Sequence, residues 1–524
     1  MSLSNQAEFG KIRAFLWPIY RNEMKKIIPM LLMIFLICFN YTILKNLKDS
    51  VVITAQSSGV EVIPFIKVWA LLPMAILATY IFTKLSNRFS QERVFYLTIT
   101  FFLVVFAIFA FLVYPYKNII HPHEVADYLE SIMPAGFKGL ISMFRNWSFT
   151  VFYVFCELWS TMVLTVLFWG FANEVTKIVE ARRFYGMMAV VGSFASTAAG
   201  VGANYLTINK NWDDSLQTLV SVVVLFGLAT MVIFWWMNKN VLSDPSFKDL
   251  HETRVGVKKK QKISLREGFR FLSNSKYLVC IAVVVVCYNL VINMVEIVWK
   301  DQLYQLYPSG KEYNDYQNDM TSIVGLFATV ISLFMSPLIS RYGWTKTALI
   351  TPIIMLVTSI GFFTFMLFRN DLHEPVYLLF GTTPLVIAVF FGAAQVCLSK
   401  ACKFSIFDST KEMAFIPLAH ETKLKGKAAI DGVGSRLGKS GSSLIYQVLF
   451  MVFSTIGASA PYVALIIMVV IVGWIIAVKS LGLQFTSLVD DDGREEIGEK
   501  KESAVIGINP SDTPSNGLQP TLGL

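Results

Sequence analysis

Twelve apolar runs separated by short polar connections dominate the hydrophobic pattern of this chain. They lie near 27–44, 62–82, 94–114, 147–171, 184–205, 216–236, 277–299, 323–339, 348–368, 376–399, 440–458 and 461–477. A helix needs about 17–25 such residues to cross the hydrocarbon core of a bilayer. Lipid accepts only helices or closed barrels, and barrel strands are shorter and alternate in polarity. The pattern therefore predicts an all-α polytopic membrane protein with twelve transmembrane helices.

Charge is scarce in the chain and unevenly placed. Charged residues make up 15% of it, against about 25% in soluble domains, and the mean hydropathy is +0.56. Most of the 45 Lys and Arg residues fall in the termini and the even-numbered connections, with a dense run at Lys258–Lys260. The positive-inside rule then places both termini in the cytoplasm. The net charge of +9 therefore reflects the orientation of the chain in the membrane and predicts no nucleic-acid partner.

The longest even-numbered connection, 237–276, divides the twelve runs into six and six. We therefore predict an N-terminal half over 27–236 and a C-terminal half over 277–485, with cargo near the midplane between them. Residues 1–26 are predicted to form a basic amphipathic segment on the inner membrane surface. The tail 486–524 is predicted to be disordered, because it begins acidic and ends in Pro, Ser and Gly.

Two connections are longer than hairpins. The outer one, 115–146, contains apolar stretches, so we expect a short helix there. The inner one, 400–439, mixes aromatic and aliphatic residues with charges, and we expect it to pack against the bundle. No apolar face requires a second copy, so a monomer is expected.

Four charged residues interrupt the membrane-length segments: Lys67, Glu157, Glu296 and Lys439. Each costs roughly 2.5–3.5 kcal/mol at the bilayer centre, so some of them must face a water-filled path. A path lined by charge through a helical bundle is typical of a transporter. Lys67 and Lys439 are the expected partners of the two carboxylates, and Arg436 lies near Lys439, where the pair could hold an anion.

Polar residues recur on one face of two segments. Tyr153, Glu157, Thr161 and Thr165 are four residues apart, and Asn289, Asn293, Glu296 and Lys300 follow at four, three and four. Such spacing places side chains on one helical face. The alternative for the hydroxyl and amide groups is an interhelical hydrogen-bond network. We predict that Tyr153 and Asn293 join the four charged residues in binding cargo.

Catalytic and metal motifs are missing from the sequence. The six cysteines form no CxxC pair, and no His stands at metal spacing, so no cofactor, metal or disulfide is expected. No Ser-His-Asp set or nucleotide-hydrolysis motif points to a membrane enzyme.

Several strings resemble the non-mitochondrial ATP/ADP translocases of plastids and of obligate intracellular bacteria such as chlamydiae and rickettsiae. The strings are Asn40–Leu44, Ile63–Lys67, Glu157–Trp159, Phe168–Asn173, Val295–Glu296, Lys425–Ala429 and Leu437–Gly441. The resemblance implies a fold similar to the major facilitator superfamily and transport of ATP, ADP or related nucleotides. It also implies that Lys67, Glu157, Glu296 and Lys439 take part in transport.

The sequence departs from the family pattern at two places. It has Lys45-Asn46 where many exchangers carry an Arg-Asp pair, and Ser-Gly-Ser after Lys439 where a second Gly is common. Close relatives include ATP/ADP exchangers, broad ribonucleotide exchangers and nucleotide–proton symporters. We take ATP/ADP exchange as the leading expectation, with the other two as alternatives.

Overall fold

The computed structural model describes residues 19–21, 23–176, 178–242, 275–418, 426, 430 and 435–505, and these residues contain helices and no strand. Ten helices in this part are long and apolar enough to cross a membrane. The first part of α16 (Gly310–Leu367) and α21 (Ser435–Phe453) occupy the eighth and eleventh predicted positions. The all-α membrane fold predicted from the apolar runs is therefore confirmed. Residues 1–18 of the predicted amphipathic segment and 243–274 of the linker lie outside the described residues.

The helices follow one another in two sets of membrane-length segments. The first set is α2 (Met24–Ile53), α3 (Val62–Phe65), η1 (Ile66–Leu71), α4 (Leu72–Arg88), α5 (Gln91–Ile108), η2 (Phe109–Val113), η3 (Tyr114–Tyr116), α6 (Lys117–Ile120), α7 (His123–Ile132), η4 (Ala135–Phe137), α8 (Lys138–Arg145), α9 (Trp147–Trp159), η5 (Ser160–Phe168), α10 (Trp169–Val175), α11 (Ile178–Leu206) and α12 (Trp212–Asn240). The second set is α15 (Lys276–Leu306), α16, α17 (His373–Phe380), α18 (Pro384–Cys402), η6 (Lys403–Phe407), α19 (Asp408–Ala414), α21 and α22 (Ile456–Val505).

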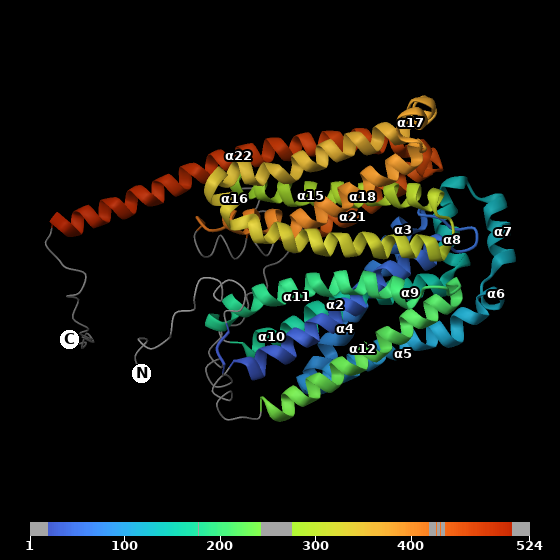
Figure 1. Cartoon of the computed structure of the whole chain (residues 1–524), viewed down its shortest axis with the longest axis horizontal. Helices are drawn as coiled ribbons and strands as arrows, with labels where there is room; N and C mark the ends of the chain where they lie inside the picture. The colour runs from blue at the N-terminus through green and yellow to red at the C-terminus, as the bar shows by residue number, and fades with distance from the viewer. Residues whose placement is uncertain are drawn as a thin grey trace, which may run out of the picture.

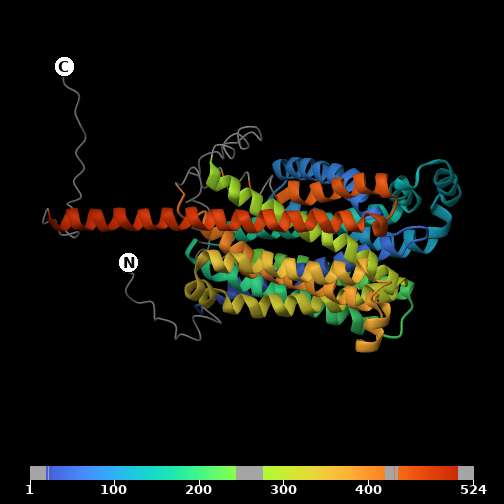
Figure 2. The same ribbon diagram turned by 90° about the horizontal axis from the view of Figure 1, so that it is seen from above.

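The two sets form two halves that lie side by side, with the helix axes roughly parallel (Figures 1 and 2). We call α2–α12 the N half and α15–α22 the C half. Helix α2 begins at one end of the bundle, and α22 leaves the bundle at the same end, which we call the terminal end (Figure 1). Helices α7 and α8 lie at the opposite end, which we call the far end. Large apolar side chains such as Leu225, Val232 and Val469 remain exposed on α12 and α22, as expected for faces that meet lipid.

Helix α16 supplies two of the predicted spans. Its backbone leaves the helical conformation at Gly343, where φ is 76°, a left-handed value that glycine adopts without the steric cost of a side chain. The eighth and ninth predicted segments therefore meet at a tight glycine junction instead of a loop.

The halves touch each other near the far end. Gly200 on α11 packs against Asn318 and Ser322 on α16, and a side chain at that glycine would collide with them. One turn nearer the far end, Asn204 Nδ2 donates to Asp319 Oδ1 at 2.7 Å. On the other side of the bundle, Gln447 Nε2 of α21 donates to the Pro64 carbonyl at 3.0 Å. The far end of the interface is thus closed by direct contacts.

Three predictions about the connections can be compared with the structure. The outer connection forms α6, α7, η4 and α8, which confirms that it contains helix. The inner connection is packed over its described part, since Ile406, Phe407 and Phe415 are buried. For the tail, α22 continues to Val505, and the predicted disorder stays a prediction. Opposite charges four residues apart in the sequence, as at Glu496 and Lys500, favour a solvated helix.

Candidate functional site

A chain of alternating charges crosses the interface between the halves. Glu157 on α9 accepts from Lys48 on α2 at 3.0 Å, and Lys48 also contacts the neighbouring Asp49 at 2.7 Å. Asp49 reaches Lys300 on α15 at 2.9 Å. Lys300 continues to Glu296 at 3.3 Å, and Glu296 to Lys400 on α18 at 3.1 Å. We call these residues the central charge network: Lys48, Asp49, Glu157, Glu296, Lys300 and Lys400.

The network is buried in its middle and partly exposed at its edges. The side chains of Lys48 and Asp49 are each 3% exposed and that of Lys300 is 7% exposed, whereas Glu157 is 29% exposed. Glu296 and Lys400 are 18% and 20% exposed. Buried charges persist in a protein only when they are paired, which the middle residues satisfy. The edge residues lie where a solute entering between the halves can reach them.

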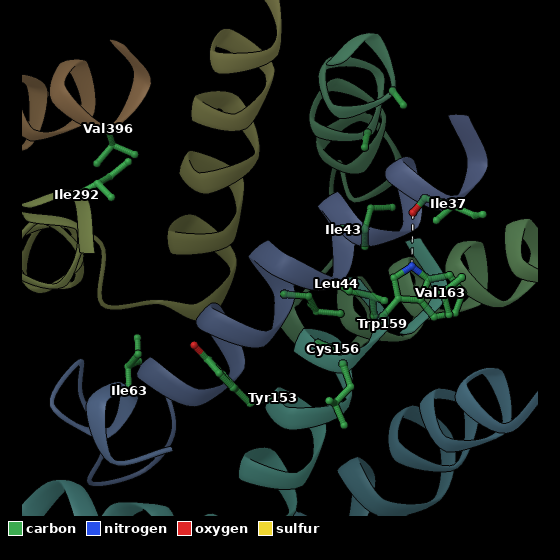
Figure 3. Packing of buried hydrophobic residues seen from close by; sticks show 14 of the residues in the cluster. Ile37, Ile43, Leu44, Ile63, Tyr153, Cys156, Trp159, Val163, Ile292 and Val396 are labelled. Atoms are coloured by element: carbon green, nitrogen blue, oxygen red, sulfur yellow. Dashed lines mark hydrogen bonds between the residues drawn. The ribbon is translucent and has the colours of Figure 1, made fainter. Parts of the chain in front are cut away.

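Apolar packing fixes α9 against α2 and so brings Glu157 to Lys48. Cys156 and Trp159 of α9 lie in the buried cluster with Ile43 and Leu44 of α2 (Figure 3). The Trp159 indole N–H donates to the Ile37 carbonyl at 3.4 Å. On the network side of α9, the ring of Tyr153 lies under Lys48, with the ammonium 3.9 Å from the ring centroid, which is a cation–π contact. The position of Glu157 is therefore set by a rigid hydrophobic interface.

Three π-helical segments adjoin charged residues near the network. Lys67 lies within η1, η5 begins three residues after Glu157, and η6 begins three residues after Lys400. A π-helical turn inserts an extra residue and rotates the following side chains, and such turns are frequent at functional sites. The Thr165 hydroxyl accordingly donates to the Ser160 carbonyl five residues earlier, at 3.1 Å.

The π-helix disrupts the predicted row of polar residues on the fourth segment. Tyr153 and Glu157 lie at the network, and Thr161 and Thr165, which belong to η5, are exposed. The spacing of four residues assumed an α-helix throughout, and η5 breaks that period after Trp159. On the seventh segment, Asn293 Nδ2 donates to the Asn289 carbonyl of its own helix at 2.7 Å, and a role for Asn293 in binding cargo stays a prediction.

Glu157 and Glu296 belong to the central charge network, whereas the predicted cations Lys67 and Lys439 form no part of it. Lys67 is partly buried and makes no ion pair in the described part of the chain, yet it interacts electrostatically with both Glu157 and Glu296. Lys439 is exposed near the start of α21 and interacts electrostatically with Lys403. Arg436 is in the first turn of α21, and its side chain lies outside the described residues.

The expected pairing of the two glutamates with Lys67 and Lys439 is therefore wrong in this conformation. Glu157 pairs with Lys48, and Glu296 pairs with Lys300 and Lys400. The sequence did not point to Lys48 and Asp49, because the first span was predicted to end at residue 44, whereas α2 continues to Ile53. The signal available was an adjacent Lys-Asp pair followed, after Ser50, by the apolar residues Val51–Ile53.

Positive charge is in excess around the network. Lys45 is partly buried on α2 and interacts electrostatically with Lys400 and Glu296. With Lys67, five lysines (Lys45, Lys48, Lys67, Lys300 and Lys400) thus meet three carboxylates (Asp49, Glu157 and Glu296). When all eight are ionised, two positive charges remain without a carboxylate. This excess of positive charge favours an anionic solute. The described residues contain no group of three His, Cys, Asp or Glu side chains arranged for a metal.

Two sets of membrane-length helices with a lysine-rich centre between them form a fold similar to that of the major facilitator superfamily. Solved structures agree on the fold. A bacterial homologue of the iron transporter ferroportin aligns with 88% of this chain and 98% of its own, with a TM-score of 0.51 and 13% identity. A D-xylose–proton symporter aligns with 86% of this chain and 97% of its own, with a TM-score of 0.53 and 12% identity.

Sequence comparisons identify the family. The family model described as TLC ATP/ADP transporter matches residues 2–485. "ADP,ATP carrier protein 1" of Chlamydia pneumoniae is 43% identical and covers 93% of this chain and 96% of its own. The chloroplastic "ADP,ATP carrier protein 1" of Arabidopsis thaliana is 40% identical over 94% of this chain and 79% of its own, and the Rickettsia typhi carrier is 38% identical over 94% and 99%. The chain belongs to the TLC ATP/ADP transporter family.

Proposed function

We propose that this protein exchanges ATP for ADP across a bacterial cytoplasmic membrane, as a secondary active transporter that works by alternating access. The relatives named above are ADP,ATP carriers and are similar over nearly the whole chain. Both termini lie in the cytoplasm in this proposal, as the positive-inside distribution of Lys and Arg predicts. The terminal end of the bundle is then the cytoplasmic end.

The observation that carries the proposal is the central charge network, which spans both halves. Together with the nearby Lys45 and Lys67, it has an excess of two lysines over carboxylates. Nucleoside di- and triphosphates carry several negative charges, and lysine ammonium groups bind phosphate oxygens through charge-assisted hydrogen bonds. A nucleotide between the halves would supply the anions that the site lacks. It would also hold residues of the two halves together while they move.

The contacts near the far end fit one step of the transport cycle. The hydrogen bonds from Asn204 to Asp319 and from Gln447 to Pro64 join the halves there. In the proposed topology the far end faces outward, so the molecule is closed to the outside. The more exposed edge of the network, formed by Glu157, Glu296 and Lys400, then faces nucleotide arriving from the cytoplasm.

We assign Lys67 to the phosphate chain, because it lies within electrostatic reach of both glutamates and makes no ion pair in the described part of the chain. Glu157 and Glu296 hold lysines in the empty protein and release them when phosphate arrives. Tyr153 orients Lys48 through its ring. Lys439, with Arg436, is assigned to phosphate at the cytoplasmic entrance, and Asn293 to a polar contact after the halves have moved.

Counterflow in proteoliposomes tests the proposal. Liposomes containing the purified protein are loaded with ATP, ADP, GTP, UTP or buffer alone, and uptake of labelled ADP is followed. Uptake only into liposomes loaded with ATP or ADP is expected. Equal uptake with all four nucleotides would favour broad ribonucleotide exchange, and uptake into buffer-loaded liposomes driven by a proton gradient would favour symport.

A further inference from the structure

The ion pair between Asp49 and Lys300 connects the two halves inside the bundle. Asp49 belongs to α2 of the N half and Lys300 to α15 of the C half, and the carboxylate and ammonium are 2.9 Å apart. Both side chains are almost completely buried, at 3% and 7% exposure. From this geometry we infer that the Asp49–Lys300 pair holds the far end closed in the empty protein, and that a phosphate anion opens it by replacing Asp49 at Lys300. The inference rests on the proposed nucleotide transport.

The residues around Asp49 on α2 form a strip that faces the C half. Asn46 and Ser50 lie three residues before and one residue after Asp49. Asn46 Nδ2 donates to Asn318 Oδ1 at 2.9 Å, and Ser50 Oγ donates to Asn314 Oδ1 at 3.2 Å, both on α16. These neutral hydrogen bonds place the ion pair within the closed interface. Opening the far end must separate all three contacts.

Separating the ion pair is the costly part of that movement. Neutral hydrogen bonds exchange with water at a small net cost, whereas a buried charge that loses its partner is strongly unfavourable. Asp49 would retain Lys48 at 2.7 Å, and Lys300 would retain Glu296 at 3.3 Å. The Lys300–Glu296 contact is the longer of these two, and Glu296 also pairs with Lys400. Lys300 is therefore the group whose charge needs a new partner when the halves separate.

A phosphate group suits that role because of its chemistry and its position. Phosphate oxygens accept from lysine as a carboxylate does, and the partly exposed Glu296 and Lys400 lead from the accessible edge of the network to Lys300. With phosphate on Lys300 and Lys48 on Asp49, the charges in the middle of the network stay paired while the halves separate. Only a ligand that binds the open state better can shift the equilibrium, and phosphate does so by occupying Lys300.

This arrangement explains why an empty molecule would stay closed to the outside. When no anion is bound, opening the far end leaves the charge of Lys300 without its close carboxylate partner. When phosphate is bound, it takes the place of that carboxylate. The pair is therefore a coupling device of the exchange reaction, in which Asp49 and Lys300 act as positioning residues.

Thiol labelling at the far end tests the inference. Asn314 is 2% exposed inside the closed interface, so Asn314→Cys reports opening when a polar maleimide reacts with it in nanodiscs. The parent chain, which keeps Asn314, measures the background from the six native cysteines. We expect slow labelling without nucleotide and faster labelling with ADP. Adding Asp49→Asn should accelerate labelling without nucleotide by about tenfold or more, the population change that loss of a charge-assisted hydrogen bond produces.

Two further variants separate coupling from general loosening. Lys300→Gln should give the same acceleration, and the double variant should add little, since either change removes the same pair. Asp213→Asn removes an ion pair with Lys117 that lies within the N half at 3.0 Å, and it should leave labelling unchanged. If adding Asp49→Asn or Lys300→Gln leaves labelling as slow as in Asn314→Cys alone while the unmodified protein performs counterflow, the inference is wrong and the proposed function stands. If the unmodified protein shows no nucleotide counterflow, the proposed function fails first.

Discussion

Removing the negative charge of Glu296 should tighten nucleotide binding. Glu296 accepts from Lys300 at 3.3 Å and from Lys400 at 3.1 Å. Phosphate must displace this carboxylate from Lys400 before it can bind there. In Glu296→Gln the neutral amide no longer competes, and Lys300 keeps Asp49. Lys400 is then available to phosphate without prior separation of an ion pair.

The size of the effect follows from the geometry of the pair. A hydrogen bond to a charged group contributes about 1.5–3 kcal/mol. Lys400 and Glu296 are 20% and 18% exposed, so water screens part of the interaction and the lower limit is appropriate. About 1.4 kcal/mol corresponds to a factor of ten. We therefore expect the Kd for ADP to fall about tenfold, and counterflow to slow because the nucleotide leaves the tighter site less often.

Isothermal titration of ADP into the purified protein, with counterflow on the same preparations, measures both effects. Lys400→Gln should change the Kd in the opposite direction, since it removes a phosphate ligand. Glu61→Gln is the matched control, because Glu61 pairs with Lys138 at 2.7 Å within the N half. Weaker ADP binding by Glu296→Gln would refute the competition argument and indicate that the carboxylate itself contacts the nucleotide.

Three further predictions concern phosphate binding, topology and pH. Lys67→Gln should weaken ADP binding about tenfold, whereas Lys258→Gln in the linker should not; equal Kd values would remove Lys67 from the site. A cysteine at Lys311 should react with an impermeant maleimide added outside intact cells and one at Lys260 should not; labelling at Lys260 would refute the topology. Burial, with lesser contributions from nearby positive groups, lowers the pKa of His121 to about 4. Since the unfolded chain has a His pKa near 6.5, this neutral histidine contributes stability above about pH 6.5 that is lost as the pH falls toward 4. The Tm of the wild type should therefore fall more between pH 7 and pH 5 than that of His121→Gln, and equal losses would contradict the assignment.

The membrane fold could be predicted from the sequence because lipid restricts the choice so strongly. Long apolar runs in a bilayer become helices, and the structure has helices at each predicted run. The boundaries were less certain, since a helix can carry charge beyond its apolar part when that charge faces another helix. Helix α2 does so at Lys48 and Asp49, which is why these two residues were missed.

The candidate site could be predicted in part. Glu157 and Glu296 stood out because a carboxylate in a membrane segment is costly unless it is paired, and both are paired in the structure. Their partners depend on which helices pack together, and helical periodicity within one segment contains no such information. The π-helical segment η5 further changes which residues share a face, as at Thr165.

The position of Lys439 is the largest difference from expectation. It was predicted to pair with a glutamate, but it is exposed on α21 and interacts electrostatically with Lys403. The cation that occupies the expected place beside Glu296 is Lys400. That residue stands one position beyond the predicted tenth span and was therefore counted with the inner connection.

Transport into liposomes with defined contents tests the central claim most directly. Labelled ADP is supplied outside liposomes that contain either ATP or buffer, with and without a protonophore. Exchange predicts that ADP enters only the ATP-loaded liposomes, that one ATP leaves for each ADP that enters, and that the protonophore changes neither quantity. Accumulation of ADP in buffer-loaded liposomes that the protonophore abolishes would contradict exchange and show that protons drive transport.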